Sequence, residues 1–568
     1  MGKLKDFRGI EGQDFFEMDR GFQTLLADLL PKGETSLVSN SLHHCARLVA
    51  GRWNDLAREA SRPERLPKIV KYDRAGNRVE RVDMGPLTRH LRREVAEFGV
   101  LTDVRGEVHK FALVYLLAHN GEASVNCGLS CTDGLIRAIE AKGSEFLRET
   151  YLPLLRSFDT PLAGAQFVTE RDGGSDVGAI ETEAKQNSEG TWSIRGEKWF
   201  CSNPDEYFLV AARPEGARAG TAGVAVFLVP RVLPDGALNK ISFKRLKDKL
   251  GTQSLPTAEI DFNDATGYAI GDTAEGFRTL MNYVIDVSRI HNAVNACGIL
   301  HRAFMEARNY ARQRDAFGAA IIQYPLVQEK LVLLLERCWR YRVLAFKLVS
   351  LIEQNGLCPS DQGQSMWQRF LINLAKYRTA STLTDSVRET ILLLGGNGII
   401  EDFTVLPRLL RDAMIIETWE GTHNTLCLQM MRDAAKSGLI DRWRSEIGTV
   451  LEEWPAQLLS RTRMVFEQAF NQTGKELSLE RLSDRGWAAT HARRAVDALG
   501  ALLELAWMVS LASRRSEDDA TPALLAALSA HFLLPDSRTF AGFDSGATSR
   551  FWGLLIEESP VKADVTAL

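Results

Sequence analysis

The feature of this sequence that most restricts its fold is a block of short β-type runs between two long helical blocks. Residues 161–275 contain runs such as GAQFVTE, TWSIRGEKWF, YFLVAAR and GVAVFLVPR, with turn-forming residues between them. Strands of this length and spacing are typical of a small β-sandwich or barrel. On both sides of this block the apolar residues recur at helical spacing. We therefore expect a chain that is helical at both ends and holds one β-rich unit in between.

These patterns predict four segments in an α+β, mainly α fold. We expect an N-terminal helical domain over 1–160, a β-domain (barrel or sandwich) over 161–275, a helical bundle over 276–440 and a helical extension over 441–568. The segment IVKYDRAGNRVERVDMG interrupts the first helical block, and its alternating pattern around Ala75-Gly76-Asn77 predicts a β-hairpin. A chain of 568 residues is longer than a single hydrophobic core usually contains, so several structural units are expected.

The balance of charges argues against DNA as a partner. Residues 441–568 contain 14 Lys and Arg against 18 Asp and Glu, and the other 440 residues balance at 55 against 55. Duplex binding relies on a basic surface. The extension is therefore not expected to bind DNA.

No pattern indicates a membrane span, a secretion signal or a metal site. The N-terminus is charged throughout, and the most apolar C-terminal stretch, LGALLELAWMVSLA, is interrupted by Glu504 and is short for a span. We therefore expect no membrane span and a cytoplasmic location. The eight cysteines form no CxxC pair and the histidines are scattered, so no metal site is predicted.

Two segments of the β-block could line a site for a flat ligand. In VTERDGGSD, adjacent glycines would let backbone amides approach a ligand beside the hydroxyl of Ser175; the alternative is an ordinary glycine turn. In KWFCSN, bulky aromatic residues followed by a hydroxyl could stack on a flat ring and bond to it. The alternative for this segment is an aromatic pair in the core.

Two segments of the later helical block could supply charged groups. Arg314 in RDAFG could bind a pyrophosphate, although an arginine in a last turn followed by Gly318 also describes an ordinary helix end. Glu420 stands in the segment ETWEGT, downstream of LGGNG. An apolar setting raises the pKa of a carboxyl group toward the range of a general base. The alternative is a solvent-facing residue before a helix that begins at Thr422.

Taken together and in this order, seven segments resemble the acyl-CoA dehydrogenase family. They are QFVTERDGGSDVG, GEKWFCSN, LKDKLGTQS, DVSRIHNAVNACGIL, ARQRDAFG, LLGGNGI and RDAMIIETWEGTHN. The chain length, the DRGFQTLL start, the hairpin and the extension further resemble the AidB-type branch, named for a bacterial alkylation-response flavoprotein. The resemblance implies FAD as cofactor, an acyl-CoA or related acyl thioester as substrate, and a homo-oligomer, most commonly a tetramer. It also implies an electron-transfer flavoprotein as a candidate electron acceptor.

The resemblance implies a role for individual residues. Glu420 matches the base that removes the α-proton while FAD accepts the β-hydride, which would give a 2-enoyl thioester. Some branches place the base where Ser288 stands here, and no carboxylate occupies that position. FAD contacts are implied for Thr169, Ser175, Phe200, Ser202, Arg314, Phe317, Gly395, Gly396 and Thr422. Substrate contacts are implied for Ser175, Asp286, Arg289 and Gly421.

The sequence departs from the family pattern at three places. Leu392 stands where many members have a glutamine, Phe200 replaces a tryptophan, and DGGSD replaces the commoner PGAGSD. These changes put in question how tightly FAD is held across the subunit interface and how well full CoA esters bind.

Three other functions stay open. One is an AidB-like flavoprotein of alkylation response that binds DNA, and a second is a weakly catalytic sensor that binds fatty acyl-CoA. A third is a flavin monooxygenase or oxidase on the same fold. The presence of Glu420 disfavours the monooxygenase, whose chemistry does not need that base.

Overall fold

A computed structural model of the chain describes residues 7–31, 33–188, 190–436, 438–515, 519–534 and 551–566. The chain forms two compact units. The first contains Met1–Gly51, Glu107–His119 and Asn292–Leu568, and the second contains Arg52–Gly106 and Asn120–His291. Because these units are defined by contacts and not by consecutive sequence, the four predicted domain boundaries stay predictions.

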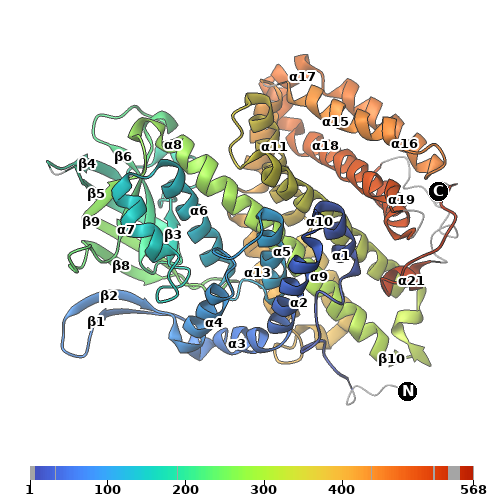
Figure 1. The fold of residues 1–568 in the computed structure, drawn as a ribbon, viewed down its shortest axis with the longest axis horizontal. Helices are drawn as coiled ribbons and strands as arrows, with labels where there is room; N and C mark the ends of the chain where they lie inside the picture. Colours follow the sequence, from blue (N-terminus) through green and yellow to red (C-terminus); the bar gives the residue numbers. More distant parts are fainter. Residues whose placement is uncertain are drawn as a thin grey trace. The chain divides into compact units, whose positions relative to one another are not determined.

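The second unit is built on a seven-stranded sheet, drawn in teal and green in Figure 1. Its strands follow the order β3-β6-β4-β5-β9-β7, with β8 paired to β9. Because β7 also pairs with β6, the strands from β6 to β7 close on themselves as a small barrel. The strands are β3 (Gly164–Phe167), β4 (Glu183–Gln186), β5 (Trp192–Ser202), β6 (Tyr207–Pro214), β7 (Ala225–Pro230), β8 (Ile241–Leu246) and β9 (Thr257–Ala269).

Strand β6 is buried on both faces, which explains its unbroken apolar run. Phe208 and Val210 point into one hydrophobic core, which fills the space between the strands. Leu209 and Ala211 point into a second core, shared with α6 (Asn126–Lys142) and α7 (Glu145–Leu155). Side chains alternate between the faces of a strand. A strand covered on both sides therefore needs an apolar residue at every position.

The second unit also contains the predicted hairpin. Strands β1 (Lys68–Tyr72) and β2 (Arg78–Asp83) pair antiparallel, which confirms that prediction. The helices α3 (Arg52–Ala60) and α4 (Gly85–Glu97) flank the hairpin in sequence. Further on, α8 (Gly276–Thr279) runs through a π-helical segment, η7 (Leu280–Ile285), into α9 (Asp286–Gln313), which belongs to the second unit up to His291 and to the first unit from Asn292 onward.

The first unit is a helical assembly around the 31-residue helix α10 (Pro325–Asn355). Its other helices before the extension are α1 (Arg20–Leu29), α2 (Thr35–Ala50), α5 (Glu107–Leu117), α11 (Gln362–Ala380), α12 (Leu383–Leu394), α13 (Leu406–Thr418) and α14 (His423–Ala434). The extension adds α15 (Leu439–Glu453), α16 (Ser460–Glu476), α17 (Leu479–Ser483), α18 (Arg485–Ser513), α19 (Thr521–Leu533) and α21 (Trp552–Ile556).

One long apolar period within the predicted helical bundle is divided between two helices. The apolar period over 365–394 indicates a single helix, whereas α11 ends at Ala380 and α12 begins at Leu383. The side chains at the break bond elsewhere: Ser381 Oγ donates to the carbonyl of Arg378, and the hydroxyl of Thr382 pairs with that of Tyr341. Serine and threonine compete with the helix for hydrogen bonds in this way.

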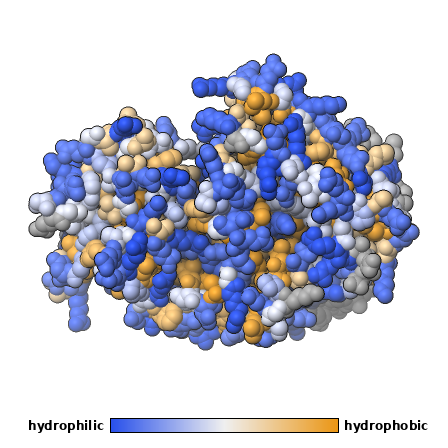
Figure 2. All heavy atoms as spheres, turned by 45° about the horizontal axis from the view of Figure 1, so that its top comes forward, coloured by the Kyte–Doolittle hydropathy of each residue, from blue (hydrophilic) through white to orange (hydrophobic). Residues whose placement is uncertain are grey.

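The apolar C-terminal stretch is a core helix. It lies in α18, which has 29 residues, so the expectation that it is short for a span is wrong. Within the described residues α18 is the one helix that is long and apolar enough to cross a membrane. However, 83% of an apolar 18-residue stretch of this helix is buried inside the protein. On the face of the surface shown in Figure 2, hydrophobic residues lie between hydrophilic ones.

Candidate active site

In the second unit, Phe200 stands on a β-bulge. Two residues of β5, Trp199 and Phe200, lie opposite the single residue Glu259 of β9. The bulge turns the Phe200 ring outward, so that the residue is 52% exposed. The Lys247 amino group lies 3.4 Å from the centre of the Trp199 ring and 4.8 Å from that of Phe200. An exposed Phe200 does not fit the alternative of an aromatic pair in the core.

Thr169 and Ser202 lie on strand ends next to this bulge. The Thr169 carbonyl accepts a hydrogen bond from the amide of Trp199 at 2.9 Å. The Ser202 hydroxyl lies 3.0 Å from the hydroxyl of Thr257, which also accepts from the Lys249 amino group at 2.9 Å. Because Lys249 can only donate, the Thr257 hydrogen is available for Ser202 Oγ. The Ser202 hydrogen is then free to be donated to a ligand.

The turn that carries Ser175 is fixed by a buried ion pair. Glu170 accepts from the Lys198 amino group at 2.6 Å and from the backbone amides of Glu181 and Thr182 at 2.6 and 3.1 Å. Burial alone would raise the pKa of Glu170, but Lys198 and the Glu181 amide hold it below its ordinary value. Ser175 itself is exposed. Glu170 and Lys198 were not predicted from the sequence, although both belong to the segments VTERD and GEKWF.

The start of α9 carries the predicted substrate residues. Asp286 and Arg289 are both buried, and Arg289 Nη1 lies 3.6 Å from Asp286 Oδ1. Between them, the Ser288 hydroxyl accepts from Gln166 Nε2 at 2.9 Å and from Ser130 Oγ at 3.2 Å. The π-helical segment η7 directly precedes these residues, and such segments are frequent at functional sites. Sequence patterns did not reveal η7, Gln166 or Ser130.

In the first unit, Glu420 lies in the loop between α13 and α14. It is half-buried and has a φ of +55°, which is rare for a residue with a side chain. Gly421 follows with a φ of +102°. Thr422 directly precedes α14, which begins at His423 and so one residue later than predicted, and its hydroxyl contacts that of Thr425 at 3.1 Å. The loop is held by Lys376, which the sequence analysis did not single out.

Arg314 and Phe317 lie at a hairpin after α9. The helix ends at Gln313, and β10 (Asp315–Ala316) pairs with β11 (Ala319–Ala320). Phe317 and Gly318 form the turn with φ values of +54° and +96°, the pattern of a tight hairpin turn. The alternative that Gly318 ends the helix is therefore wrong. Phe317 is 99% exposed at the tip.

The segment with Gly395 and Gly396 forms a short 3-10 turn, η9 (Gly395–Ile399). A Cβ at either glycine would meet no atom within 4 Å, so the backbone is open to an approaching group. Leu392 and Ile399 beside it are 61% and 69% exposed. Large exposed apolar side chains gathered in one segment are typical of a contact surface.

Two family models match segments of the chain that contain these residues. "Acyl-CoA dehydrogenase, middle domain" matches residues 165–265, and "Acyl-CoA dehydrogenase, C-terminal domain" matches residues 274–435. "Acyl-CoA dehydrogenase family member 11" of Caenorhabditis elegans is 31% identical over 427 residues, which cover 72% of this chain and 68% of the relative. "Putative acyl-CoA dehydrogenase AidB" of Escherichia coli is 30% identical over 383 residues, 64% of this chain and 69% of the relative.

The chain belongs to the acyl-CoA dehydrogenase family. As a member of this family it is an oxidoreductase that acts on CH–CH groups. A solved structure, that of Caenorhabditis elegans ACDH-11 in complex with C11-CoA, superposes with a TM-score of 0.85 and 25% identity, covering 98% of this chain and 97% of that one. The shared fold therefore covers 98% of this chain and includes the C-terminal extension. All predicted site residues lie within the two matched family segments.

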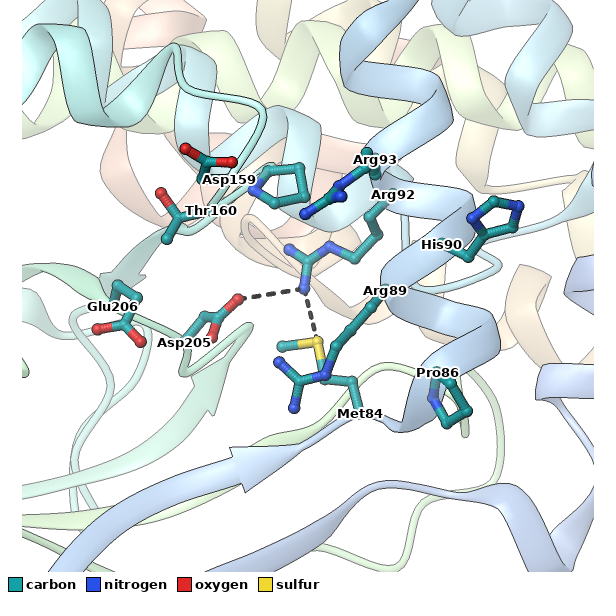
Figure 3. Close-up of a pocket in the computed structure, with 11 residues that line it drawn as sticks. Met84, Pro86, Arg89, His90, Arg92, Arg93, Asp159, Thr160, Asp205 and Glu206 are labelled. Atoms are coloured by element: carbon teal, nitrogen blue, oxygen red, sulfur yellow. Dashed lines mark hydrogen bonds and ion pairs between the residues drawn. The ribbon is translucent and has the colours of Figure 1, made fainter.

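A cavity of about 360 Å³ in the second unit lies apart from the predicted site residues of this acyl-CoA dehydrogenase (Figure 3). Arginines of α4 face the acidic residues Asp159, Asp205 and Glu206 across it. Arg92 is buried, donates to Asn203 Oδ1 at 2.6 Å and lies 3.7 Å from Asp205. Positive and negative groups compensate each other here, so the cavity indicates no particular ligand.

The first unit also contains a buried group that the sequence did not reveal. Asp19, His301 and Glu558 bring three potential metal-ligand atoms within 4.8 Å of one another. Each carboxylate already has a guanidinium partner: Arg342 for Asp19, and Arg308 at 2.8 Å for Glu558. Because the charges are balanced, we interpret the group as a buried ion-pair network. The absence of a metal site stays a prediction.

Proposed function

We propose that this protein is an FAD-dependent acyl-CoA dehydrogenase that converts an acyl thioester to its 2-enoyl thioester, with Glu420 as the base. The observation that carries the proposal is the loop of Glu420. A carboxylate stands in the matched ETWEGT segment, half-buried and in a left-handed conformation. Such conformations persist where the surrounding structure enforces them, and they cluster at active sites.

The residues of the second unit fit FAD. The Phe200 ring is exposed for stacking, the Ser202 hydroxyl can donate a hydrogen bond, and Thr169 lies beside them. In the first unit Arg314 offers a guanidinium group that suits a pyrophosphate, next to Phe317. When bound, FAD supplies the acceptor for the hydride that leaves the β-carbon.

Glu420 would accept the α-proton of the thioester on its carboxylate. Its backbone N–H, as in other members of the family, would donate to the thioester carbonyl and so acidify the α-carbon. Gly421 leaves space next to the carboxylate for the ligand. Ser288 is hydrogen-bonded to Gln166 and carries no carboxylate, so it offers no competing base. Asp286 and Arg289 would contact the substrate from α9.

We further propose that the protein is a homotetramer in the cytoplasm, with an electron-transfer flavoprotein as electron acceptor. The exposed Leu392 and Ile399, which lie in one segment, support self-association, because large apolar side chains seldom gather on a free surface, and Phe317 at its hairpin tip is also exposed. A weakly catalytic acyl-CoA sensor is the second candidate. It is supported by the similarity to ACDH-11, whose structure contains C11-CoA.

An anaerobic titration separates the two candidates. The FAD-loaded protein is mixed with acyl-CoAs from short and branched to long, and the flavin absorbance is followed. Wild type is expected to bleach with one chain class, and Glu420→Gln is not. Glu401→Gln, at a surface glutamate paired with Arg411, is the matched control and should bleach as wild type does. Binding of acyl-CoA without bleaching would refute the dehydrogenase and support the sensor.

A further inference from the structure

Lys376 connects α11 to both ends of the Glu420 loop. Its side chain is fully buried. The amino group donates to the carbonyl of Glu417 at 3.1 Å and to the carbonyl of Gly421 at 2.8 Å. These two carbonyls lie on either side of Glu420 in sequence, so one side chain holds both ends of the loop.

The C-terminal end of α13 needs such donors. The last carbonyls of a helix have no partner within the helix. Here the Ile416 carbonyl accepts from Asn292 Nδ2 at 3.2 Å, and the Glu417 carbonyl accepts from Lys376. A lysine at this end is also favoured by the helix dipole. The chain can therefore stop the helix at Thr418 and turn sharply into the loop.

The conformation of Glu420 itself requires support. A left-handed conformation in a residue other than glycine costs about 1–3 kcal/mol and persists only where the surroundings enforce it. Glu420 has a φ of +55° and is followed by Gly421, whose carbonyl is the shorter of the two Lys376 contacts. Without that contact, the residues that carry the carboxylate would be free to return to an ordinary conformation.

The C-terminal extension holds the part of α11 that carries Lys376. The neighbouring Tyr377 donates to Asp497 Oδ1 of α18 at 3.0 Å. Arg378 donates to Asp497 at 2.8 Å and, through Nε, to the buried Glu504 at 2.7 Å. The two residues that follow Lys376 are thus hydrogen-bonded to α18. These bonds hold this part of α11, and with it Lys376, against the extension.

We propose that Lys376 is a positioning residue for Glu420, and that α18 of the extension keeps Lys376 in place. This inference rests on the proposed function, in which Glu420 is the base. Lys376 does not take part in proton transfer. It fixes the backbone so that the carboxylate lies where the α-proton is presented, and a displacement of about 1 Å can cost a factor of about 100 in rate.

The test replaces Lys376 by methionine, which keeps the length of the side chain and removes its donors. The full-length, FAD-loaded Lys376→Met protein is expected to lose about 100-fold in kcat with little change in KM. Hydrogen exchange of the amides over 417–422 should become faster at the same time. Lys376→Arg, which keeps donors, should recover part of both. Lys110→Met, at another buried lysine of the first unit, is the matched control and should change neither.

The measurements also separate this inference from the proposed function. If none of the acyl-CoAs bleaches the flavin of the wild-type protein, the dehydrogenase is refuted. Faster exchange over 417–422 in Lys376→Met would even then support the inference that Lys376 holds the loop. Unchanged exchange there would overturn the inference, as would an unchanged kcat in an active enzyme. If Lys376→Met does not fold, Lys376→Arg decides: a lower kcat with unchanged KM and faster exchange over 417–422 would support positioning, and a lower kcat with exchange as slow as in wild type would overturn it.

Discussion

The buried carboxylate of Glu504 offers a sharp test of how the extension is joined to the helical bundle. Glu504 of α18 is fully buried and accepts hydrogen bonds from two arginines. Arg378 donates to both of its oxygens, at 2.7 and 3.1 Å, and Arg340 donates to one. Burial would raise the pKa of Glu504, but these guanidinium groups hold it below its ordinary value, so the group is ionised at neutral pH. The perturbation we propose is Glu504→Gln.

The size of the effect follows from the charges. Arg340 and Arg378 are balanced by Glu336 and Glu504, and all four are buried. Glu504→Gln leaves one excess positive charge among these buried members, because Asp497, which also pairs with Arg378, is 47% exposed and therefore screened by solvent. Breaking a buried ion pair costs about 3–5 kcal/mol, and because one carboxylate here serves two guanidinium groups we expect the upper half of that range.

The assay is urea unfolding of the full-length protein, followed by circular dichroism. Because the urea m-value of a chain of this size is above about 3 kcal/mol/M, a loss of about 4 kcal/mol should lower the midpoint by up to about 1 M. Glu467→Gln, at an exposed pair with Arg463, is the control and should cost about 0–1 kcal/mol.

A double variant tests the explanation by charge. Arg378→Met with Glu504→Met leaves Arg340 paired with Glu336, so the group is neutral again. It should therefore lose much less than the two single variants together. A loss below 1 kcal/mol for Glu504→Gln, or strictly additive single losses, would refute the reasoning.

Three further predictions follow from the packing. Burial lowers the pKa of His119 to about 4, so between about pH 6.5 and 4 the unfolded chain binds a proton that the folded chain does not. The free energy of unfolding should therefore fall by up to about 3 kcal/mol over this range. His119→Asn should reduce this pH dependence in urea unfolding. Gly276→Ala should cost about 1–3 kcal/mol in thermal unfolding, since its Cβ would lie 2.4 Å from Ala225 Cα; an unchanged midpoint would contradict this. Phe317→Ser should dissociate the oligomer in light scattering without lowering the midpoint of unfolding, whereas Tyr72→Ser, also exposed, should not.

The sequence by itself determined the succession of elements, because local patterns decide it. The period of two in the β-block and the period of 3.6 on both sides predicted strands and helices in the right order. The Ala75-Gly76-Asn77 hairpin was predicted for the same reason. The segment that holds Glu420 was found by its likeness to a family, and the likeness to known relatives confirmed that family.

Local patterns failed where a side chain had two possible partners. The break at Ser381 lies in a continuous apolar period, and the hydroxyl groups of Ser381 and Thr382 form hydrogen bonds at that point. Gly318 looked like a helix end, but the chain had already left the helix and formed a hairpin. In both cases the apolar period predicted helix correctly but not the residue at which a helix ends.

Only the tertiary structure decided which distant residues support the site. Lys376 reaches the carbonyl of Gly421 across 45 residues, and Arg340 reaches Glu504 across 164. A buried polar group must find a partner, but its own sequence neighbourhood does not say which one. That choice is made when helices pack and bring backbone carbonyls and charges together, which is why Glu420 could be proposed as the base from the sequence and its contact with Lys376 could not.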